Sequence, residues 1–353
     1  MAQPQLTQRE KVVLAQTVLI FITTGAPVAS RAVLEATGLQ VSSATIRNVM
    51  ASLEARGLLR QPHTSAGRVP TPEALRHYIE HMVTREPVAP QIDRQLRHTL
   101  AQPQSVEGLL QCASRVLSAF SSFAGLASPP DESLLRLRHV ELVSLAPCRV
   151  LAVMVTDGDV VRDHVVELER PVSPTDLARM QNFLGEIIVG KTLVEARATL
   201  RRQIETEQIR CDAMIRDAVD VASKALEQEA GAALVVEGEL NFLSLEDFGD
   251  LDRARKLLQA LKDKRELLVI LDGLGQTQER GTQVLVGPLL PDDSPSNSFH
   301  HCSFILSPYK RHGQTMGWIG VVGPLRMRYR WLIPLVETTA DLVRQRLERP
   351  AWG

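Results

Sequence analysis

Two glycines near the start of the chain, Gly38 and Gly57, each follow a short amphipathic run and sharply limit how that region can fold. Glycine readily takes the left-handed conformation that ends a helix, so each run is expected to stop there. The first run begins at Ser30 and the second at Ser42 or Ser43, and serine is a residue type that caps helix N-termini. The pattern predicts two short helices joined by a tight turn.

The second of these helices has two clearly different faces. Its apolar residues recur with helical spacing and predict a buried face made of Ile46, Val49, Met50 and Leu53. The opposite face consists of small and polar residues, namely Ser43, Ala44, Arg47, Asn48 and Ala51. Small residues let a helix enter the major groove of DNA, and Arg and Asn are the side chains that read guanine and adenine edges. The second helix is therefore predicted to read DNA.

The residues that follow predict a short basic β-ribbon. Residues 58–70 read LLRQPHTSAGRVP, with Arg60 and Arg68 on either side of a turn. The turn also offers polar contacts to DNA, from His63, Thr64 and Ser65, although a lone histidine in a loop is more often simply solvated. Thr71 and Pro72 then start a further helix.

Helix, turn, helix and ribbon together make a winged helix. In this fold the second helix lies in the major groove, and the ribbon contacts phosphates or the minor groove. Some winged helices bind only protein, and that alternative stays open. The face around Arg47 and Asn48 favours DNA, because a protein-binding face would usually expose aromatic residues or leucine.

Composition indicates an ordinary globular protein with a mildly basic N-terminal part. The 353 residues suffice for two or three domains, and 44% are hydrophobic and 23% charged. Residues 1–84 carry eight Lys or Arg against five acidic residues, whereas the whole chain has a net charge of −1. An excess of positive charge in one part is a weak indication of a polyanionic partner.

Cysteine spacing and hydropathy indicate a cytoplasmic protein without metal or membrane segment. The four cysteines are far apart and form no C-x-x-C motif, so we expect reduced thiols and no metal site. The apolar segment at residues 12–23 is too short to span a bilayer. Thr7 and Glu10 precede it with the spacing of a helix capping box, which predicts a buried helix.

The rest of the chain alternates between helical and extended patterns. Residues 91–126 predict one or two helices, and residues 139–168 predict two or three antiparallel strands with a turn at Asp157-Gly158. Residues 174–229 are helical again, strands from 232 onward surround a helix near 250–263, and a last helix covers about 330–348. This order predicts an α+β fold in which a helical segment is inserted into a sheet domain.

One motif points to an enzyme. Residues 185–192, GEIIVGKT, match the phosphate-loop pattern G-x-x-x-x-G-K-[ST], and residues 267–272, LLVILD, resemble a strand that ends in a magnesium ligand. A phosphate loop follows a strand, whereas the residues before this motif have helical spacing. Gly190 as a helix end, and Thr192 with Glu195 as a capping box, explain the motif as a helix–linker–helix joint. We therefore expect an ordinary buried strand at LLVILD, no NTPase or other enzyme activity, and no cofactor.

Two segments resemble one protein family. Residues 42–71, SSATIRNVMASLEARGLLRQPHTSAGRVPT, closely resemble the winged-helix signature of HrcA, the heat-inducible transcription repressor of bacteria, and residues 317–329, GWIGVVGPLRMRY, resemble its C-terminal block. The resemblance implies a winged-helix domain at 1–86, a GAF-like domain at 91–170 and 230–350, and an inserted dimerisation domain at 171–229. It also implies repression of chaperone operons through an inverted-repeat operator in double-stranded DNA, and a GroE chaperonin that keeps the repressor active.

A symmetric operator requires a homodimer, and one stripe of small residues is a candidate interface. Its members share one helix face and are Cys211, Ile215, Ala218, Ala222 and Ala225. Such a stripe would let two helices from different subunits approach closely. The alternative, that the stripe packs inside its own domain, has equal support from the sequence.

Overall fold

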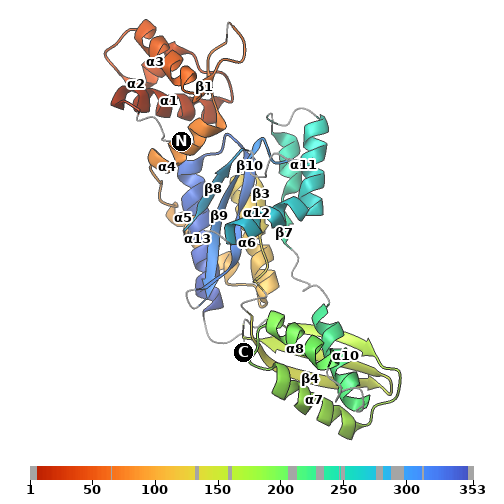
Figure 1. Cartoon of the computed structure of the whole chain (residues 1–353). Helices are drawn as coiled ribbons and strands as arrows, with labels where there is room; N and C mark the ends of the chain where they lie inside the picture. The colour runs from red at the N-terminus through yellow and green to blue at the C-terminus, as the bar shows by residue number, and fades with distance from the viewer. Residues whose placement is uncertain are drawn as a thin grey trace.

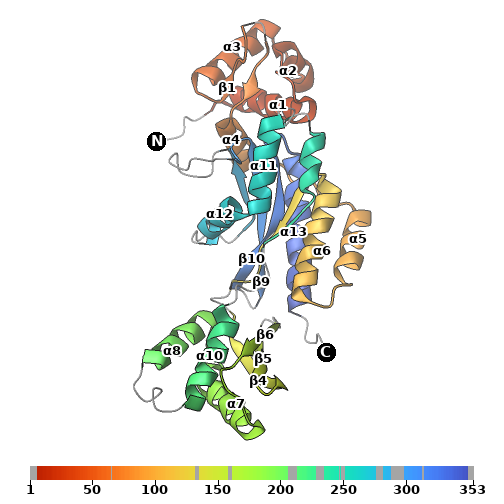
Figure 2. The ribbon, with the colours of Figure 1, turned by 90° about the vertical axis from the view of Figure 1, so that its right-hand side faces the viewer.

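The chain folds into three parts that lie in a row in an elongated molecule, with a head at one end, a body in the middle and a lower unit at the other end (Figures 1 and 2). The computed structural model describes residues 6–348 except 65, 132–134, 158–160, 206–212, 228–233, 246, 248–250, 276–280, 288–297 and 312–313. Helices and strands occur together in all three parts, which confirms the predicted α+β class.

The head has the predicted order of helix, turn, helix, ribbon and helix. Its elements are α1 (Gln8–Thr24), α2 (Ser30–Thr37), α3 (Ser43–Ala55), β1 (Leu59–Arg60), β2 (Val69–Pro70) and α4 (Pro72–His81). Gly38 and Gly57 have φ angles of 62° and 75°, which are left-handed conformations that glycine adopts without strain. Both glycines therefore stop their helices as expected.

Helix starts in the head are only partly as predicted. Thr7 and Glu10 form the expected capping box at the start of α1. Helix α2 instead has Ala29 as its N-cap, without a side-chain hydrogen bond, so the expected cap by Ser30 is wrong. The Ser30 hydroxyl lies 3.2 Å from the Ser43 hydroxyl, so it links α2 to the start of α3.

The body is a five-stranded sheet with helices on both faces. Its strands, in spatial order, are β7 (Val235–Glu237), β3 (Ala124–Ala127), β10 (Gln314–Pro324), β9 (Cys302–Arg311) and β8 (Gln283–Val286). One face packs on α5 (Pro90–Leu100), α6 (Val106–Ser121) and α13 (Tyr329–Leu347). The other packs on η1 (Glu239–Ser244), α11 (Leu251–Asp263) and α12 (Arg265–Gly275).

The head packs directly against one edge of the body. Val286 of the edge strand β8 belongs to the same buried cluster as the apolar residues of α1 and α4. The Arg76 guanidinium of α4 donates to the Val286 carbonyl at 2.9 Å. In the chain segment after α4, Arg85 pairs with Glu337 of α13 at 2.7 Å. Apolar packing and polar contacts together hold the head on the body.

The lower unit has its own sheet, and this differs from the prediction. Its elements are β4 (Leu137–Ala146), β5 (Arg149–Thr156), β6 (Val161–Glu167), α7 (Pro174–Ile188), α8 (Leu193–Glu205) and α10 (Ala213–Glu227). In the described part of the chain, these three strands pair only with one another. The strands expected to belong to the body therefore lie with the helices of 174–227. We propose that the insertion begins near residue 135, not at 171.

Two other segments also differ from the prediction. LLVILD lies within α12 and is not a strand. The buried residues of α12, which are Leu267, Ile270, Leu271 and Leu274, recur with helical spacing, while Leu268 and Val269 are exposed. The expected helices of 91–126 end at Ser121, because Ala124–Ala127 forms the buried strand β3. Gly125 lets this strand approach α6, since an added Cβ would lie 1.9 Å from the Ser114 carbonyl oxygen.

Candidate nucleic-acid interface

Helix α3 presents the polar face that the sequence predicted. It starts after Ser42, whose hydroxyl accepts a hydrogen bond from the Thr45 amide at 3.1 Å. Its apolar residues face the head core, with Ile46, Met50 and Leu53 fully buried and Val49 partly buried. The residues on the opposite face, which are Ala44, Arg47, Asn48 and Ala51, are exposed, and Ser43 at the first turn is half-buried.

Arg47 and Asn48 are the two side chains on this face that can read bases. Both are exposed, and neither has a hydrogen bond or ion pair with the part of the chain that the structure describes. Their donors and acceptors are therefore available to an external partner. Because the neighbouring Ala44 and Ala51 are small, an approaching groove would meet no bulky side chain between them.

The ribbon has the geometry of a wing. Strands β1 and β2 are antiparallel, with Arg60 opposite Val69. Val28 forms an isolated bridge with Arg68 and adds a third extended segment to the ribbon. An added Cβ at Gly67 would lie 2.4 Å from the Val28 carbonyl oxygen, so glycine is required for this close approach. The ribbon is thereby fixed to the segment that precedes α2.

The wing tip is closed by Gln61, for which no role was expected. The Gln61 side-chain amide donates to the carbonyl oxygens of Thr64 at 3.0 Å and Ala66 at 2.9 Å. His63 and Thr64 are exposed at this tip, whereas Ser65, also a predicted contact, lies outside the described residues. A glutamine next to a proline turn gave no recognisable signal of this role in the sequence.

Arg60 and Arg68 were expected to act alike, and the structure separates them. Arg60 is exposed. The Arg68 guanidinium lies 2.9 Å from a carboxylate oxygen of Glu54 on α3, and its side chain is only 15% exposed. Contrary to the expectation, Arg68 is therefore not presented to a phosphate. It holds the wing against α3, because it joins a ribbon strand to the last turn of that helix.

A buried carboxylate joins α1 to α3. Glu10 accepts hydrogen bonds from the Thr7 amide and the Ser52 hydroxyl, both at 2.9 Å, and lies 3.6 Å from the Arg56 guanidinium. The Thr7 amide, followed by the Thr7 and Ser52 hydroxyls and Arg56, holds the pKa of Glu10 below its ordinary value, although burial acts in the opposite direction. Its stabilising effect is thus present above the ordinary glutamate pKa and is lost as the pH falls through the lowered one. Glu10 fixes the orientation of α3 at neutral pH.

The predicted dimerisation stripe is buried inside its own subunit. Ala218, Ala222 and Ala225 are at most 4% exposed and belong to the core that α10 forms with α7, α8 and the three-stranded sheet. Ile215 packs partly buried against the same core, and Cys211 lies outside the described residues. The prediction of an intersubunit stripe is therefore wrong. Small residues allow α10 to approach its own sheet closely, which is the alternative the sequence left open.

GEIIVGKT is a joint between two helices, as predicted. Helix α7 ends at Ile188, Gly190 has a φ of 81°, and Thr192 with Glu195 caps α8 through hydrogen bonds of 2.8 and 3.1 Å. The Gly190 amide donates to the Leu137 carbonyl at 2.7 Å. A phosphate loop needs such amides to face the ligand, so this one cannot serve as a cradle.

Substitution of either key side chain at this joint should lower stability without affecting nucleotide binding. We expect Thr192→Ala to lower the free energy of unfolding by about 0.5–2 kcal/mol, because it removes a helix cap. Lys191→Ala removes only one 3.0 Å hydrogen bond to Thr199, so its cost should stay within about 0.5–1.5 kcal/mol. Denaturant unfolding of both variants measures this. Titration with magnesium-ATP is the control, and micromolar binding that Lys191→Ala abolishes would contradict the assignment.

The described residues hold no helix that is both long and apolar enough to cross a membrane. They also hold no cluster of three or more His, Cys, Asp or Glu side chains in a metal-binding arrangement.

The fold defines a class, a protein whose winged-helix head is carried on a mixed α+β body. The family model described as the HrcA protein C-terminal domain matches residues 107–333. A heat-inducible transcription repressor HrcA from Xanthomonas oryzae pv. oryzae (strain KACC10331 / KXO85) is 36% identical over 347 residues, covering 98% of this chain and 97% of that one. The chain belongs to the HrcA family.

Further comparisons agree with this assignment. A protein of the same description from Xylella fastidiosa (strain M12) is 33% identical over 98% of this chain and 97% of its own. A solved crystal structure of a hypothetical protein has a TM-score of 0.59 and 21% sequence identity, and covers 97% of this chain and 99% of that one. At this identity the solved structure supports the fold alone.

Proposed function

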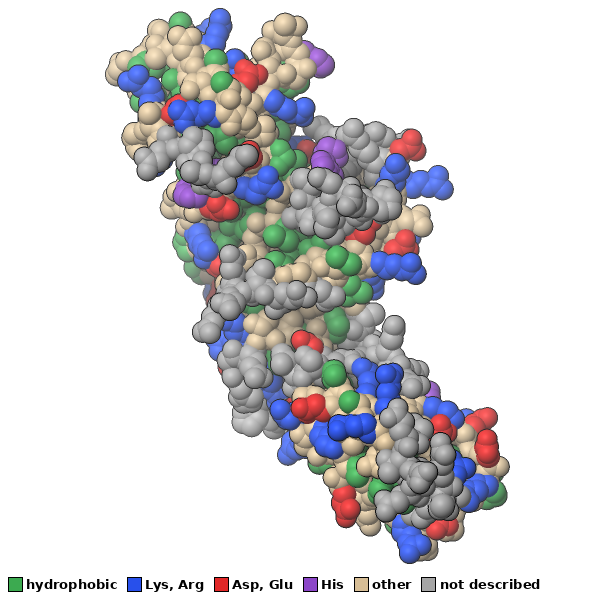
Figure 3. Space-filling model, in the orientation of Figure 1, with side chains coloured by type: hydrophobic (Ala, Val, Ile, Leu, Met, Phe, Trp, Pro, Cys, Tyr) green, Lys and Arg blue, Asp and Glu red, His purple; other side chains and the backbone are tan. Residues whose placement is uncertain are grey.

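We propose that this protein is a transcriptional repressor that acts in the cytoplasm and binds an inverted-repeat operator before chaperone genes as a homodimer. The observation that carries the proposal is the exposed face of α3, on which Arg47 and Asn48 stand free between small residues. Basic side chains lie along the visible edges of the head (Figure 3). The names of the relatives, heat-inducible transcription repressors, supply the kind of regulation.

We assign the DNA contacts to different parts of the head. Helix α3 enters the major groove, where Arg47 pairs with guanine and Asn48 with adenine. Arg60 and the wing tip at His63 and Thr64 contact the backbone, which sets position but carries no sequence information. Arg68 acts indirectly, because it fixes the wing on α3 through Glu54.

The direct test is a gel shift with salt titrated. The probe is promoter DNA of a chaperone operon that contains an inverted repeat, compared with DNA of the same composition in scrambled order. Specific binding should exceed binding to scrambled DNA by roughly 10³-fold or more at physiological salt. Both affinities should fall with salt, because phosphate contacts release counterions. Equal binding to both probes would exclude a sequence-specific repressor.

The dimer requires a surface other than the α10 stripe, and we propose the open face of the three-stranded sheet. Helices α7, α8 and α10 lie on one side of this sheet (Figure 2). On the other side, Val143, Leu151 and Val165 stand in one row across β4, β5 and β6, and Val155 stands opposite Val161. Val143, Val161 and Val165 are 39%, 59% and 37% exposed.

This face is unusual for a solvated surface. Antiparallel sheets with one face in water normally alternate apolar and polar residues, whereas here both faces of β5 are apolar. Exposed apolar patches of this kind mark association sites. An isologous contact about a twofold axis would bring two copies of the same patch together and place two heads on one operator. The lower unit is far from the head (Figure 1), so it can dimerise without blocking α3.

We also propose that a GroE chaperonin raises the active fraction of this protein. Support comes from the family resemblance and from apolar side chains that remain exposed on the body, such as Leu240, Leu243 and Val269 at 67%, 57% and 58%. Adding purified chaperonin and ATP to a partly inactive preparation should increase the operator-bound fraction in a gel shift. A chaperonin that is unable to hydrolyse ATP is the control. An unchanged fraction at every temperature between growth and heat shock would contradict this route.

A further inference from the structure

A cavity of about 730 Å³ lies at the joint between the head and the body. Leu19, Ile22 and Thr23 of α1 line it from the head, and residues at the end of α6 and the start of α13 line it from the body. Its size is in the range of pockets that hold small organic ligands. DNA binding by α3 and dimerisation by the lower unit leave this cavity without a role.

Three arginines line the cavity, two just before α13 and one in its first turn, and they differ in what they already bind. Arg326 pairs with Asp247 at 2.7 Å, and Arg330 lies 3.4 Å from Glu86. Arg328 lies between them in sequence, is exposed, and has no hydrogen bond or ion pair with any described side chain. The cavity therefore carries one guanidinium whose charge is not balanced by a described carboxylate.

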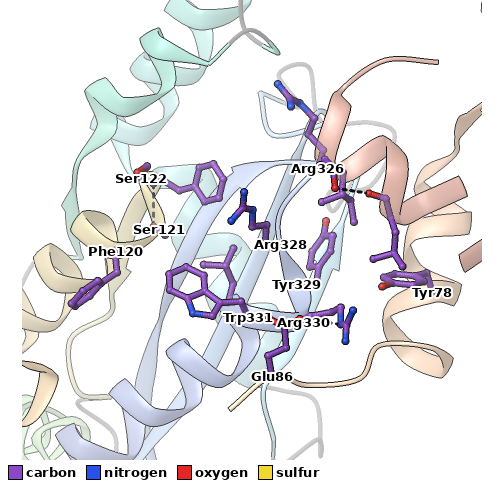
Figure 4. Close-up of a pocket in the computed structure, with 15 residues that line it drawn as sticks. Tyr78, Glu86, Phe120, Ser121, Ser122, Arg326, Arg328, Tyr329, Arg330 and Trp331 are labelled. Atoms are coloured by element: carbon purple, nitrogen blue, oxygen red, sulfur yellow. Dashed lines mark hydrogen bonds and ion pairs between the residues drawn. The ribbon is translucent and has the colours of Figure 1, made fainter. Parts of the chain in front are cut away.

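Aromatic side chains stand beside this guanidinium. Phe123 comes from the loop after α6 and Trp331 from the first turn of α13, and both are half-buried. Phe120, at the end of α6, lines the cavity away from Arg328 (Figure 4). Figure 4 shows Arg328 extending over the sheet between Trp331 and the arginine at 326. A ligand with a planar apolar ring would pack against the aromatic side chains, and an acid group on the same ligand would bind Arg328.

We propose that this cavity is a binding site for a small aromatic anion, with its acid group on Arg328 and its ring against Trp331. Residues of both the head and the body line the site, so a bound molecule would contact the two parts at once. Its occupancy would then stabilise one orientation of the head relative to the body. The proposal does not depend on the identity of the DNA target.

The probe for this site is 8-anilinonaphthalene-1-sulfonate, a planar aromatic anion. Its neutral analogue N-phenyl-1-naphthylamine, which lacks the sulfonate, is the matched control. Fluorescence titration of the full chain gives the affinity for each. Arg328→Ala should weaken binding of the sulfonate roughly tenfold or more, because it removes a charge-assisted hydrogen bond, and should leave the neutral analogue within twofold. Trp331→Phe should reduce the energy transfer from tryptophan to the bound probe, with Trp318 and Trp352 left as the remaining donors.

Two further variants make the result specific. Arg328→Lys keeps the charge and should restore part of the sulfonate affinity. Arg138→Ala removes an exposed arginine from the lower unit and should change neither affinity. The proposal is overturned if Arg328→Ala and Arg138→Ala bind the sulfonate as the wild type does, or if Arg328→Ala weakens both probes equally. Competition by benzoate and by phenyl phosphate then shows which acid group the site prefers.

Discussion

Arg47→Ala should weaken operator binding by about 1–3 kcal/mol for each half-site while leaving binding to scrambled DNA almost unchanged. The reason is the position of Arg47 on α3, exposed and without a partner in the described part of the chain. Its guanidinium can form two parallel hydrogen bonds with one guanine, and these are lost only on DNA that offers that base. Asn48→Ala should have an effect of the same kind at an adenine. Fluorescence anisotropy with both DNAs at fixed salt measures these differences.

Two matched variants separate base reading from charge. Arg47→Lys keeps the positive charge but cannot form the paired hydrogen bonds, so most of the specificity should still be lost. Arg31→Ala removes a charge from α2, where the side chain is 85% exposed, and should lower both affinities alike or not at all. If Arg47→Ala bound the operator with wild-type affinity, α3 would not be the recognition helix.

Leu151→Asp should convert the proposed dimer into a monomer of 39.0 kDa and reduce operator affinity by at least roughly 100-fold. Leu151 stands between Val143 and Val165 in the central row of the open sheet face. Two carboxylates brought together in an apolar contact would be desolvated without a partner, which strongly opposes association. Loss of the dimer also loses the advantage of binding two half-sites at once. Sedimentation equilibrium gives the mass, and anisotropy gives the affinity.

Controls are needed because a charge on a strand can also unfold a domain. Val165→Asp tests the same row at a more exposed position, and Leu240→Asp adds the same charge to an exposed apolar residue of the body. Circular dichroism should show all three variants folded. Only Leu151→Asp and Val165→Asp should dissociate into monomers, and Leu240→Asp should remain a dimer. Deleting 171–229 is a poorer test, because it removes the helices that cover the sheet. A Leu151→Asp protein that remained a dimer would exclude this face.

The head could be predicted from the sequence in detail because its signals are local. A capping box, two helix-ending glycines and an apolar stripe with helical spacing each act within a few residues, and the structure contains all of them. The roles of individual wing residues could not be predicted in the same way. Arg60 and Arg68 look equivalent in the ribbon, and only the position of Glu54 on α3 distinguishes them.

The GEIIVGKT joint could be predicted from the sequence only in its local features. The capping box at Thr192 and the left-handed Gly190 follow from residue types at fixed spacing, and both are present. That the Gly190 amide is already bonded to Leu137 required the structure, because the two residues are far apart in sequence.

Sequence alone thus determined the α+β class, the winged-helix head and the resemblance to one family, since these rest on local caps, periodicity and contiguous motifs. Tertiary structure decided which strands share a sheet, because the residue pattern along β4, β5 and β6 predicts strands without showing which strands they pair with. It also decided that LLVILD is a helix, since a short apolar run fits a buried strand or a half-buried helix until its partners are known. The stripe on α10 follows the same rule, because small residues permit close packing but do not specify the partner, which here is the subunit's own core.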